Sequence, residues 1–230
     1  MKIYNNKRDY SGGNNHRKNG ELKVWEYIKN KFKPNIVFDV GVEEFSYIAD
    51  NSLKETIVFL FEPNPKHYQC IMKKYSNFKN IHIHNFGFGN FDNQELNLYP
   101  STGSIFYRNK TVPVNRLSKE SVQIKLRTID NFVSENNIEK IDFLKIDVEG
   151  YELNVLLGAK NFLEKINLIQ FEYGGTYIDA GITLKQVIDL FPSHFFYAIE
   201  HNGLNRVFPE SLYNETKYTN FLVSKTELHE

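Results

Sequence analysis

The stretch NIVFDVGVEEFS, residues 35–46, decides the fold class, because it joins an apolar strand to a turn that carries an acid and a glycine. Residues 35–40 are apolar toward both faces, as central strands of parallel sheets are. Asp39 and Gly41 stand where such a strand opens into a nucleotide-binding turn. A second glycine is expected a few residues later, but Glu43 and Glu44 occupy that place. The stretch therefore predicts an α/β sheet and a ligand-binding loop of altered chemistry.

Outward from this stretch, predicted strands and helices alternate along the chain. Strands are expected at residues 35–40, 56–61, 81–84, 94–99, 122–127, 141–148, 166–171, 195–200 and 218–224. Helices are expected at residues 21–32, 45–53, 65–75, 151–164 and 183–190, with Asn64 and Thr183 as N-caps of the third and the last. This alternation predicts a mostly parallel sheet with helices on both faces.

The chain is expected to form one domain over residues 20–230, because no repeat or linker divides it. Residues 1–19 are polar and rich in asparagine, glycine and basic side chains, and they are expected to form a flexible N-terminal arm. Residues 100–120 form a polar stretch that is too long for a tight hairpin. Its aromatic and arginine side chains would suit a lid over a sugar, although a surface loop is almost equally consistent with them.

Composition limits the classes of protein to be considered. The 230 residues include 28 basic and 28 acidic side chains, so the formal charge is zero, and no nucleic-acid partner is expected. Cys70 is the single cysteine, which excludes an internal disulfide and a CxxC zinc site. The polar N-terminus does not resemble a signal peptide, and no apolar run is long enough for a membrane span. A cytoplasmic protein without a membrane partner is expected, and its oligomeric state stays open.

Acidic side chains stand at four of the expected strand ends, where α/β sheets bind their ligands. The strand ends carry Asp39, Val40, Gly41, Glu62, Phe86, Gly87, Asp147, Glu149 and Glu172. A buried carboxylate without a partner is costly, so packing alone gives no reason for these acids. Each one could merely stabilise the start of the following helix, but the set as a whole favours a function.

Glu62 follows Asp39 by 23 residues (62 − 39), close to the offset of roughly 20 at which an acid binds a nucleotide ribose. Both NAD and S-adenosylmethionine could use such an acid. A dinucleotide also needs a glycine-rich turn for its pyrophosphate, and the GxGxxG pattern is absent here. Since S-adenosylmethionine has no phosphate, methyl transfer is preferred to hydride transfer.

Five motifs, in this order and spacing, resemble the FkbM family of S-adenosylmethionine-dependent methyltransferases. They are FDVG at 38–41, FEPNP at 61–65, LRTID at 126–130, IDFLKIDVEGYELNVLLGA at 141–159 and IQFEYGG at 169–175. The similarity extends from about residue 19 to about residue 224. It implies a class I methyltransferase fold, with a Rossmann-like seven-stranded sheet whose last strand is antiparallel. It also implies O-methylation, often of sugars or glycan-related small molecules.

On this resemblance, the expected cofactor site comprises Asp39, Val40, Gly41, Glu62, Pro63, Asn64, Phe86, Gly87 and Asp147. The family loop usually reads DVGANxGxxS, so this chain lacks two residues after Gly41 and has Glu43 in place of the second glycine. A glutamate beside the cofactor's carboxylate would repel it. Glu43 and Glu44 are therefore expected either to point away or to reach the cofactor's cationic groups.

Candidate catalytic residues are Asp147, Glu149, Glu172 and His201. The three acids would converge near the transferred methyl group, as a base or as ligands of Mg²⁺, although a metal-free reaction is preferred at this stage. For Glu149 and Glu172 the alternatives are a helix cap and a lysine pair. For His201 the role of a turn residue is preferred. The acceptor is expected to be a saccharide or another small hydroxyl compound. The alternative function is a degenerate module that has lost its cofactor and serves as an interaction protein.

Overall fold

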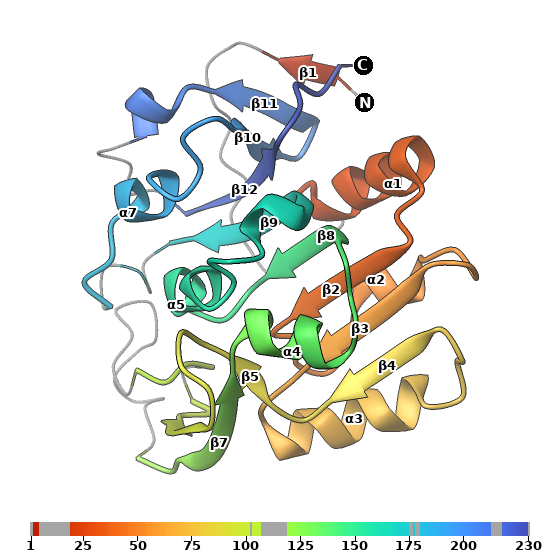
Figure 1. The fold of residues 1–230 in the computed structure, drawn as a ribbon, viewed down its shortest axis with the longest axis vertical. Helices are drawn as coiled ribbons and strands as arrows, with labels where there is room; N and C mark the ends of the chain where they lie inside the picture. The colour runs from red at the N-terminus through yellow and green to blue at the C-terminus, as the bar shows by residue number, and fades with distance from the viewer. Residues whose placement is uncertain are drawn as a thin grey trace.

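The computed structural model describes residues 2–4, 19–101, 103–106, 119–174, 177, 180–212 and 218–229. Its centre is a nine-stranded sheet with the order β1-β11-β10-β12-β9-β8-β2-β3-β4. In sequence order these strands are β1 (Lys2–Tyr4), β2 (Ile36–Val40), β3 (Ile57–Phe61), β4 (Ile81–His84), β8 (Ile141–Ile146), β9 (Ile166–Tyr173), β10 (Phe195–Glu200), β11 (Gly203–Val207) and β12 (Thr219–Ser224). Figure 1 shows the sheet running through the molecule from β4 to β11.

Seven neighbouring strands of this sheet, in the order β10-β12-β9-β8-β2-β3-β4, reproduce the sheet that the sequence predicts. β2 is paired in parallel with β3 and β8, and β8 in parallel with β9. β12 lies between β9 and β10 and is antiparallel to both. The class I methyltransferase fold with an antiparallel last strand is therefore confirmed.

Two further strands extend the sheet beyond β10. β11 forms a hairpin with β10, and β1 pairs in parallel with β11. β1 comes from the segment expected to be a flexible arm, and residues 5–18 of that arm lie outside the described residues. Asn19, expected at the end of the arm, is instead buried, and its side-chain oxygen accepts a hydrogen bond from the Glu21 backbone N–H.

Helices cover both faces of the large sheet, as Figure 1 shows. One face packs against α1 (Glu21–Phe32), α2 (Tyr47–Asp50) and α3 (Pro65–Tyr75). The other packs against α4 (Ile129–Glu135), α5 (Glu152–Leu157) and α7 (Leu184–Ile188). The described residues also form two short 3₁₀ helices, η2 (Leu163–Lys165) and η3 (Pro209–Leu212). Within the described residues, no helix has the length and apolar character that crossing a membrane requires.

The expected N-caps form as predicted. The side chain of Asn64 accepts a hydrogen bond from Lys66 N at 3.0 Å, and Pro65 stands at the first helical position of α3. Thr183 and Gln186 form a capping box at the start of α7. These caps satisfy backbone N–H groups that have no partner inside the helix.

The helix expected over residues 151–164 is shorter in the structure. α5 ends at Leu157, and hydrogen-bonded turns lead on to η2. Gly158 lies directly against the Gly89 carbonyl, because a Cβ built on Gly158 would be 1.9 Å from that oxygen. The contact belongs to the junction with a second sheet, which has the order β5-β7-β6, with β5 (Gly87–Phe88), β6 (Gln94–Leu98) and β7 (Val122–Arg127).

Candidate active site

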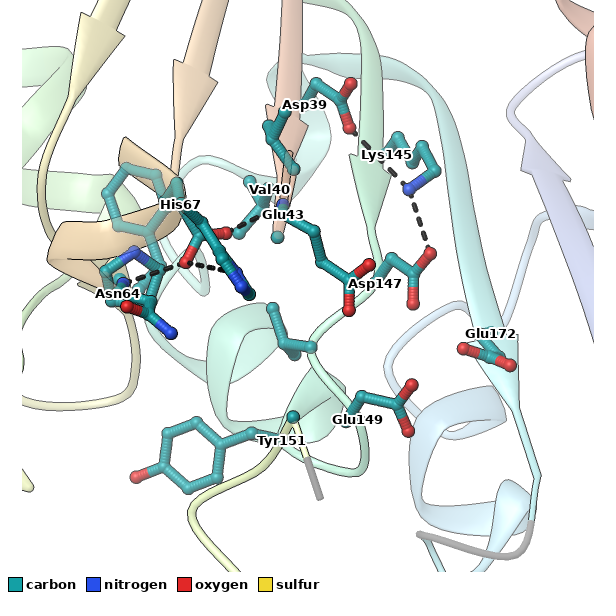
Figure 2. Close-up of a pocket in the computed structure, with 18 of the residues that line it drawn as sticks. Asp39, Val40, Glu43, Asn64, His67, Lys145, Asp147, Glu149, Tyr151 and Glu172 are labelled. Carbon is teal, nitrogen blue, oxygen red and sulfur yellow. Dashed lines mark hydrogen bonds and ion pairs between the residues drawn. The ribbon is translucent and has the colours of Figure 1, made fainter. Parts of the chain in front are cut away.

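A cavity of about 220 Å³ opens at the carboxyl ends of β2, β3, β8 and β9. Figure 2 shows the labelled side chains that line it. Of the expected site residues, Asp39, Val40, Gly41, Glu62, Pro63, Asn64, Gly87, Asp147, Glu149 and Glu172 all line this cavity. The tertiary structure thus brings together acids that are separated by more than a hundred positions in the chain.

Two expected residues are not brought into the lining. Phe86 packs against Phe61 and the aromatic core, and its neighbours Gly87 and Phe88 face the cavity instead. His201 is exposed in the turn between β10 and β11, which agrees with its alternative role as a turn residue. Neither residue is kept as a candidate for the site.

Glu62 ties two segments of the cavity wall together. One of its carboxylate oxygens accepts a hydrogen bond from the backbone N–H of Glu43 and the other from that of Asn64, both at 2.8 Å. Its side chain is buried, and burial raises its pKa to about 7 in spite of these donors. Each oxygen of a carboxylate has a second lone pair, so Glu62 can still accept hydrogen bonds from a ligand.

The loop after β2 keeps the backbone of a glycine-type turn. Gly41 has a φ of 83°, and a Cβ built on it would be 1.8 Å from the Asp147 carbonyl oxygen. Glu43 has a φ of 55°, which is a left-handed conformation that favours glycine. Glu43 thus stands in the conformation that suits the glycine it replaces.

The Glu43 side chain extends toward Asp147 in Figure 2, and Glu43 lines the cavity. Its charge contributes to raising the pKa of Glu149, after burial and the charges of Asp147 and Glu152. Glu44 is exposed and is not part of the lining. Of the two glutamates in this loop, Glu43 therefore faces the cavity and Glu44 does not.

A buried polar row crosses the three central strands behind the cavity. Asp39 is in register with Lys145, and Lys145 with Gln170. Lys145 Nζ lies 3.0 Å from Asp147 Oδ2 and 3.7 Å from Asp39 Oδ1, as the dashed lines of Figure 2 indicate. Burial alone would lower the pKa of Lys145, but the two carboxylates raise it well above its usual value.

Asp39 is held at this row by a second contact. The Ser46 hydroxyl, which is also the N-cap of α2, donates a 2.6 Å hydrogen bond to Asp39 Oδ2. Asp39 therefore orders the loop that carries Glu43, besides lining the cavity. Lys145 and Ser46 are functional candidates that sequence reasoning missed. A lysine inside an otherwise apolar strand was the available signal for Lys145.

Asp147, Glu149 and Glu172 form a carboxylate cluster at the other side of the cavity. Ligand atoms of the three side chains lie within 4.8 Å of one another, which is close enough to share a metal ion. Burial, followed by the charges of Asp147 and Glu149, raises the pKa of Glu172 well above its usual value. Burial and neighbouring charges likewise raise the pKa of Glu149 to about 8. Like charges so close together favour a proton or a cation among them.

Glu149 reaches the cluster from a constrained backbone. Glu149 and Gly150 have φ values of 54° and 98°, so two successive residues are left-handed. Ser104 Oγ donates a 2.7 Å hydrogen bond to the Glu149 carbonyl, and Glu152 accepts from Gly150 N. Such conformations persist where the surrounding structure enforces them, and they are typical of functional sites. The alternative role of Glu149 as a helix cap is not seen, since the N-cap residue of α5 is Tyr151 and no side-chain hydrogen bond caps this helix.

The FkbM methyltransferase domain model matches residues 30–217, which is most of the chain. The match includes all the residues that line the cavity except Asn19, Glu21, Tyr218 and Asn220. The chain belongs to the FkbM methyltransferase family. Among its relatives, this FkbM protein is 28% identical to the hexuronic acid methyltransferase AglP of Haloferax volcanii over 176 residues. The match covers 75% of this chain and 67% of AglP.

A second relative is the 2-O-methyltransferase NoeI of Sinorhizobium fredii, which is 34% identical over 73 residues, 31% of this chain and 30% of NoeI. Among solved structures, a Clostridium thermocellum protein assigned as an rRNA-methylase has a TM-score of 0.50 at 11% identity. That match covers 91% of this chain and 98% of the other, and it supports the fold alone.

Membership of the FkbM family makes this protein a methyltransferase that uses S-adenosylmethionine. The cavity fits this cofactor in two respects. Glu62 offers a buried carboxylate beside the loop that follows β2, where a ribose is held in such folds. Glu43 gives the adjoining loop a negative charge, which suits a cofactor that carries a sulfonium and an ammonium group.

Proposed function

We propose that the protein transfers the methyl group of S-adenosylmethionine to a hydroxyl group of a saccharide or a related small molecule. The observation that carries the proposal is that one cavity joins Glu62 to the carboxylate cluster of Asp147, Glu149 and Glu172. The hexuronic acid methyltransferase named among the relatives supports a sugar-related acceptor.

The cofactor would occupy the side of the cavity formed by the loops after β2 and β3. Glu62 would accept hydrogen bonds from the ribose hydroxyls, and Pro63 and Asn64 would shape the adjoining wall. Asp39 and Ser46 would hold the loop after β2 in place through their 2.6 Å hydrogen bond. These residues would fix the position of the methyl group, and positioning accounts for much of the rate in such a displacement.

S-adenosylmethionine supplies a methyl group on a sulfonium, so the new O–C bond forms as the C–S bond breaks and its electron pair stays on sulfur. The hydroxyl proton must leave at the same time, and the carboxylates of Asp147 and Glu149 face the cavity. Lys145 holds Asp147 in place at 3.0 Å. Either carboxylate can take the proton directly or through water.

Cofactor binding separates this proposal from its alternative, a degenerate module of the same fold. Wild-type protein should bind S-adenosylhomocysteine with one site per chain in a calorimetric titration. Glu62→Ala should weaken this binding at least about tenfold, because hydrogen bonds to a charged group contribute roughly 1.5–3 kcal/mol each. The matched control is Glu44→Ala, which removes an exposed acid of the neighbouring loop and should bind as wild type does.

The pH dependence of S-adenosylhomocysteine binding should show whether the carboxylate of Glu62 contributes to the affinity. With its pKa at about 7, Glu62 is mostly protonated at pH 6 and mostly ionised at pH 8. One unit below its pKa a carboxyl is about one-eleventh ionised, so affinity should fall roughly tenfold from pH 8 to pH 6. Glu62→Ala should lose this dependence. No binding by the wild type at either pH would favour the degenerate module.

The charge of Glu43 should make the site prefer S-adenosylmethionine to S-adenosylhomocysteine, since only the former carries a sulfonium. Glu43→Gln keeps the size and the left-handed backbone but removes the charge. The ratio of the two affinities should fall by about two- to fivefold, which corresponds to a solvent-exposed charge pair of roughly 0.5–1 kcal/mol. Parallel titrations of both compounds give this ratio. An unchanged ratio would place the sulfonium away from Glu43.

A further inference from the structure

A second row of polar side chains crosses the sheet at the carboxyl ends of β8 and β9. It lies two residues beyond the row of Asp39, Lys145 and Gln170. Ile146 is in register with Phe171, so Asp147 and Glu172 are the next pair along β8 and β9. Glu172 is in register with Asn220 of β12. Directly paired residues have their side chains on the same face of a sheet. Asp147, Glu172 and Asn220 therefore stand side by side above three adjacent strands, and all three line the cavity.

Asn220 is the member of this row that points to a ligand. Asn220 is 8% exposed and lines the cavity beside Glu172, which is 6% exposed. Within the described part of the chain, no hydrogen bond or ion pair occupies its side-chain amide. The residue is largely buried and its side chain faces the cavity, so its amide oxygen is available to a ligand there. An amide left in this state beside three carboxylates is best explained by a ligand that all four contact.

The chemistry of the four side chains selects the ligand. Asp147, Glu149 and Glu172 offer carboxylate oxygens within 4.8 Å of one another, and Asn220 offers an amide oxygen. Lys145 lies at this cluster, but it is shared with Asp39 in the deeper row. Hard oxygen donors of this kind suit Mg²⁺, Mn²⁺ or Ca²⁺, and four of them leave coordination positions for water or substrate oxygens.

We propose that Asp147, Glu149, Glu172 and Asn220 bind one divalent cation of the Mg²⁺ class, which holds the acceptor hydroxyl and lowers its pKa. The cation's role in the reaction rests on the proposed function, but its binding does not. From the sequence a metal-free reaction was preferred, and Asn220 was not among the expected site residues. A bound cation would release the acceptor proton more readily and would offset the repulsion within the cluster.

The binding test uses the full chain, freed of metal with EDTA and dialysed, and titrated with Mn²⁺ in a calorimeter. Wild type should bind one Mn²⁺ per chain, and Mg²⁺ should compete for the site. Glu172→Gln and Asn220→Ala should each weaken binding at least about tenfold. The control Glu139→Gln removes an exposed carboxylate just before β8 and should leave binding unchanged. Thermal melting shows whether each variant is folded.

Several results would contradict or separate the metal site and the proposed function. The proposed site is wrong if the wild type does not bind Mn²⁺. It is also wrong if Glu172→Gln and Asn220→Ala are folded and bind Mn²⁺ as tightly as the wild type does. Methyl transfer should stop in EDTA and return with added Mg²⁺, and full activity in EDTA overturns the catalytic role. If S-adenosylhomocysteine binds while Mn²⁺ does not, this inference fails and the proposed function stands. If Mn²⁺ binds while S-adenosylhomocysteine does not, the metal site stands and the proposed function fails.

Discussion

Asp147→Asn should lower the rate of methyl transfer by about 10²- to 10⁴-fold, the range expected when a positioned acid–base group is lost. Affinity for S-adenosylhomocysteine should change far less. Asparagine keeps an oxygen that can accept from Lys145, which lies 3.0 Å from the Asp147 carboxylate, so the fold should hold. The variant loses only the carboxylate that faces the acceptor. Turnover under saturating cofactor and calorimetric titration measure the two effects separately.

A surface variant provides the comparison for Asp147→Asn. Asp189→Asn removes an exposed carboxylate whose partner is Lys185, and it should leave both turnover and cofactor affinity unchanged. If Asp147→Asn reduced cofactor affinity as much as turnover, Asp147 would belong to the cofactor site alone. The carboxylate cluster would then need another member, Glu149 or Glu172, as its reacting group.

Gly41→Ala should destabilise the protein by about 2–5 kcal/mol. The φ of 83° costs an alanine roughly 1–2 kcal/mol, and the added Cβ, 1.8 Å from the Asp147 carbonyl oxygen, forces a backbone shift that costs roughly 1–3 kcal/mol more. For a chain of this length the melting temperature should fall by about 4–20 °C. Differential scanning calorimetry or circular dichroism at increasing temperature measures it.

Gly181 offers a matched control for this prediction. It also has a positive φ, 69°, but a Cβ built there would meet no atom within 4 Å. Gly181→Ala should therefore show the cost of the left-handed backbone without the clash, roughly 1–2 kcal/mol. Equal losses in the two variants would mean that the contact between Gly41 and the Asp147 carbonyl does not constrain the fold.

The close contact at Gly41 constrains the turn after β2. In the structure, Gly41 lies against the carbonyl of Asp147, and Asp147 N donates a 2.9 Å hydrogen bond to Val40 O. Gly41 thus joins the end of β2 to the end of β8. The cofactor loop and the carboxylate cluster are held together at this point.

Local patterns in the sequence determined most of the central elements and much of the candidate site, but not β1, β11 or the end of α5. Apolar runs predicted central strands such as β2, β3 and β8, because a strand buried on both faces needs apolar side chains throughout, and alternation predicted the edge strand β4. Asn64 and Thr183 marked helix starts, because a cap bonds to backbone only two or three residues away. The acids at strand ends predicted the cavity, because parallel strands bring their carboxyl ends to one edge.

Only the tertiary structure decided which of these residues meet. Lys145 is paired with Asp39, more than a hundred positions away, and Asn220 stands beside Glu172 from an antiparallel strand. The register between strands that are distant in the chain sets both pairs, and no local pattern records it. The direction of Glu43 was also decided there, since Glu62 binds its backbone N–H at 2.8 Å and fixes the turn. Sequence determines what each strand end carries, but sheet pairing and loop anchoring determine which charges share a cavity, because those contacts join segments that are far apart in the chain.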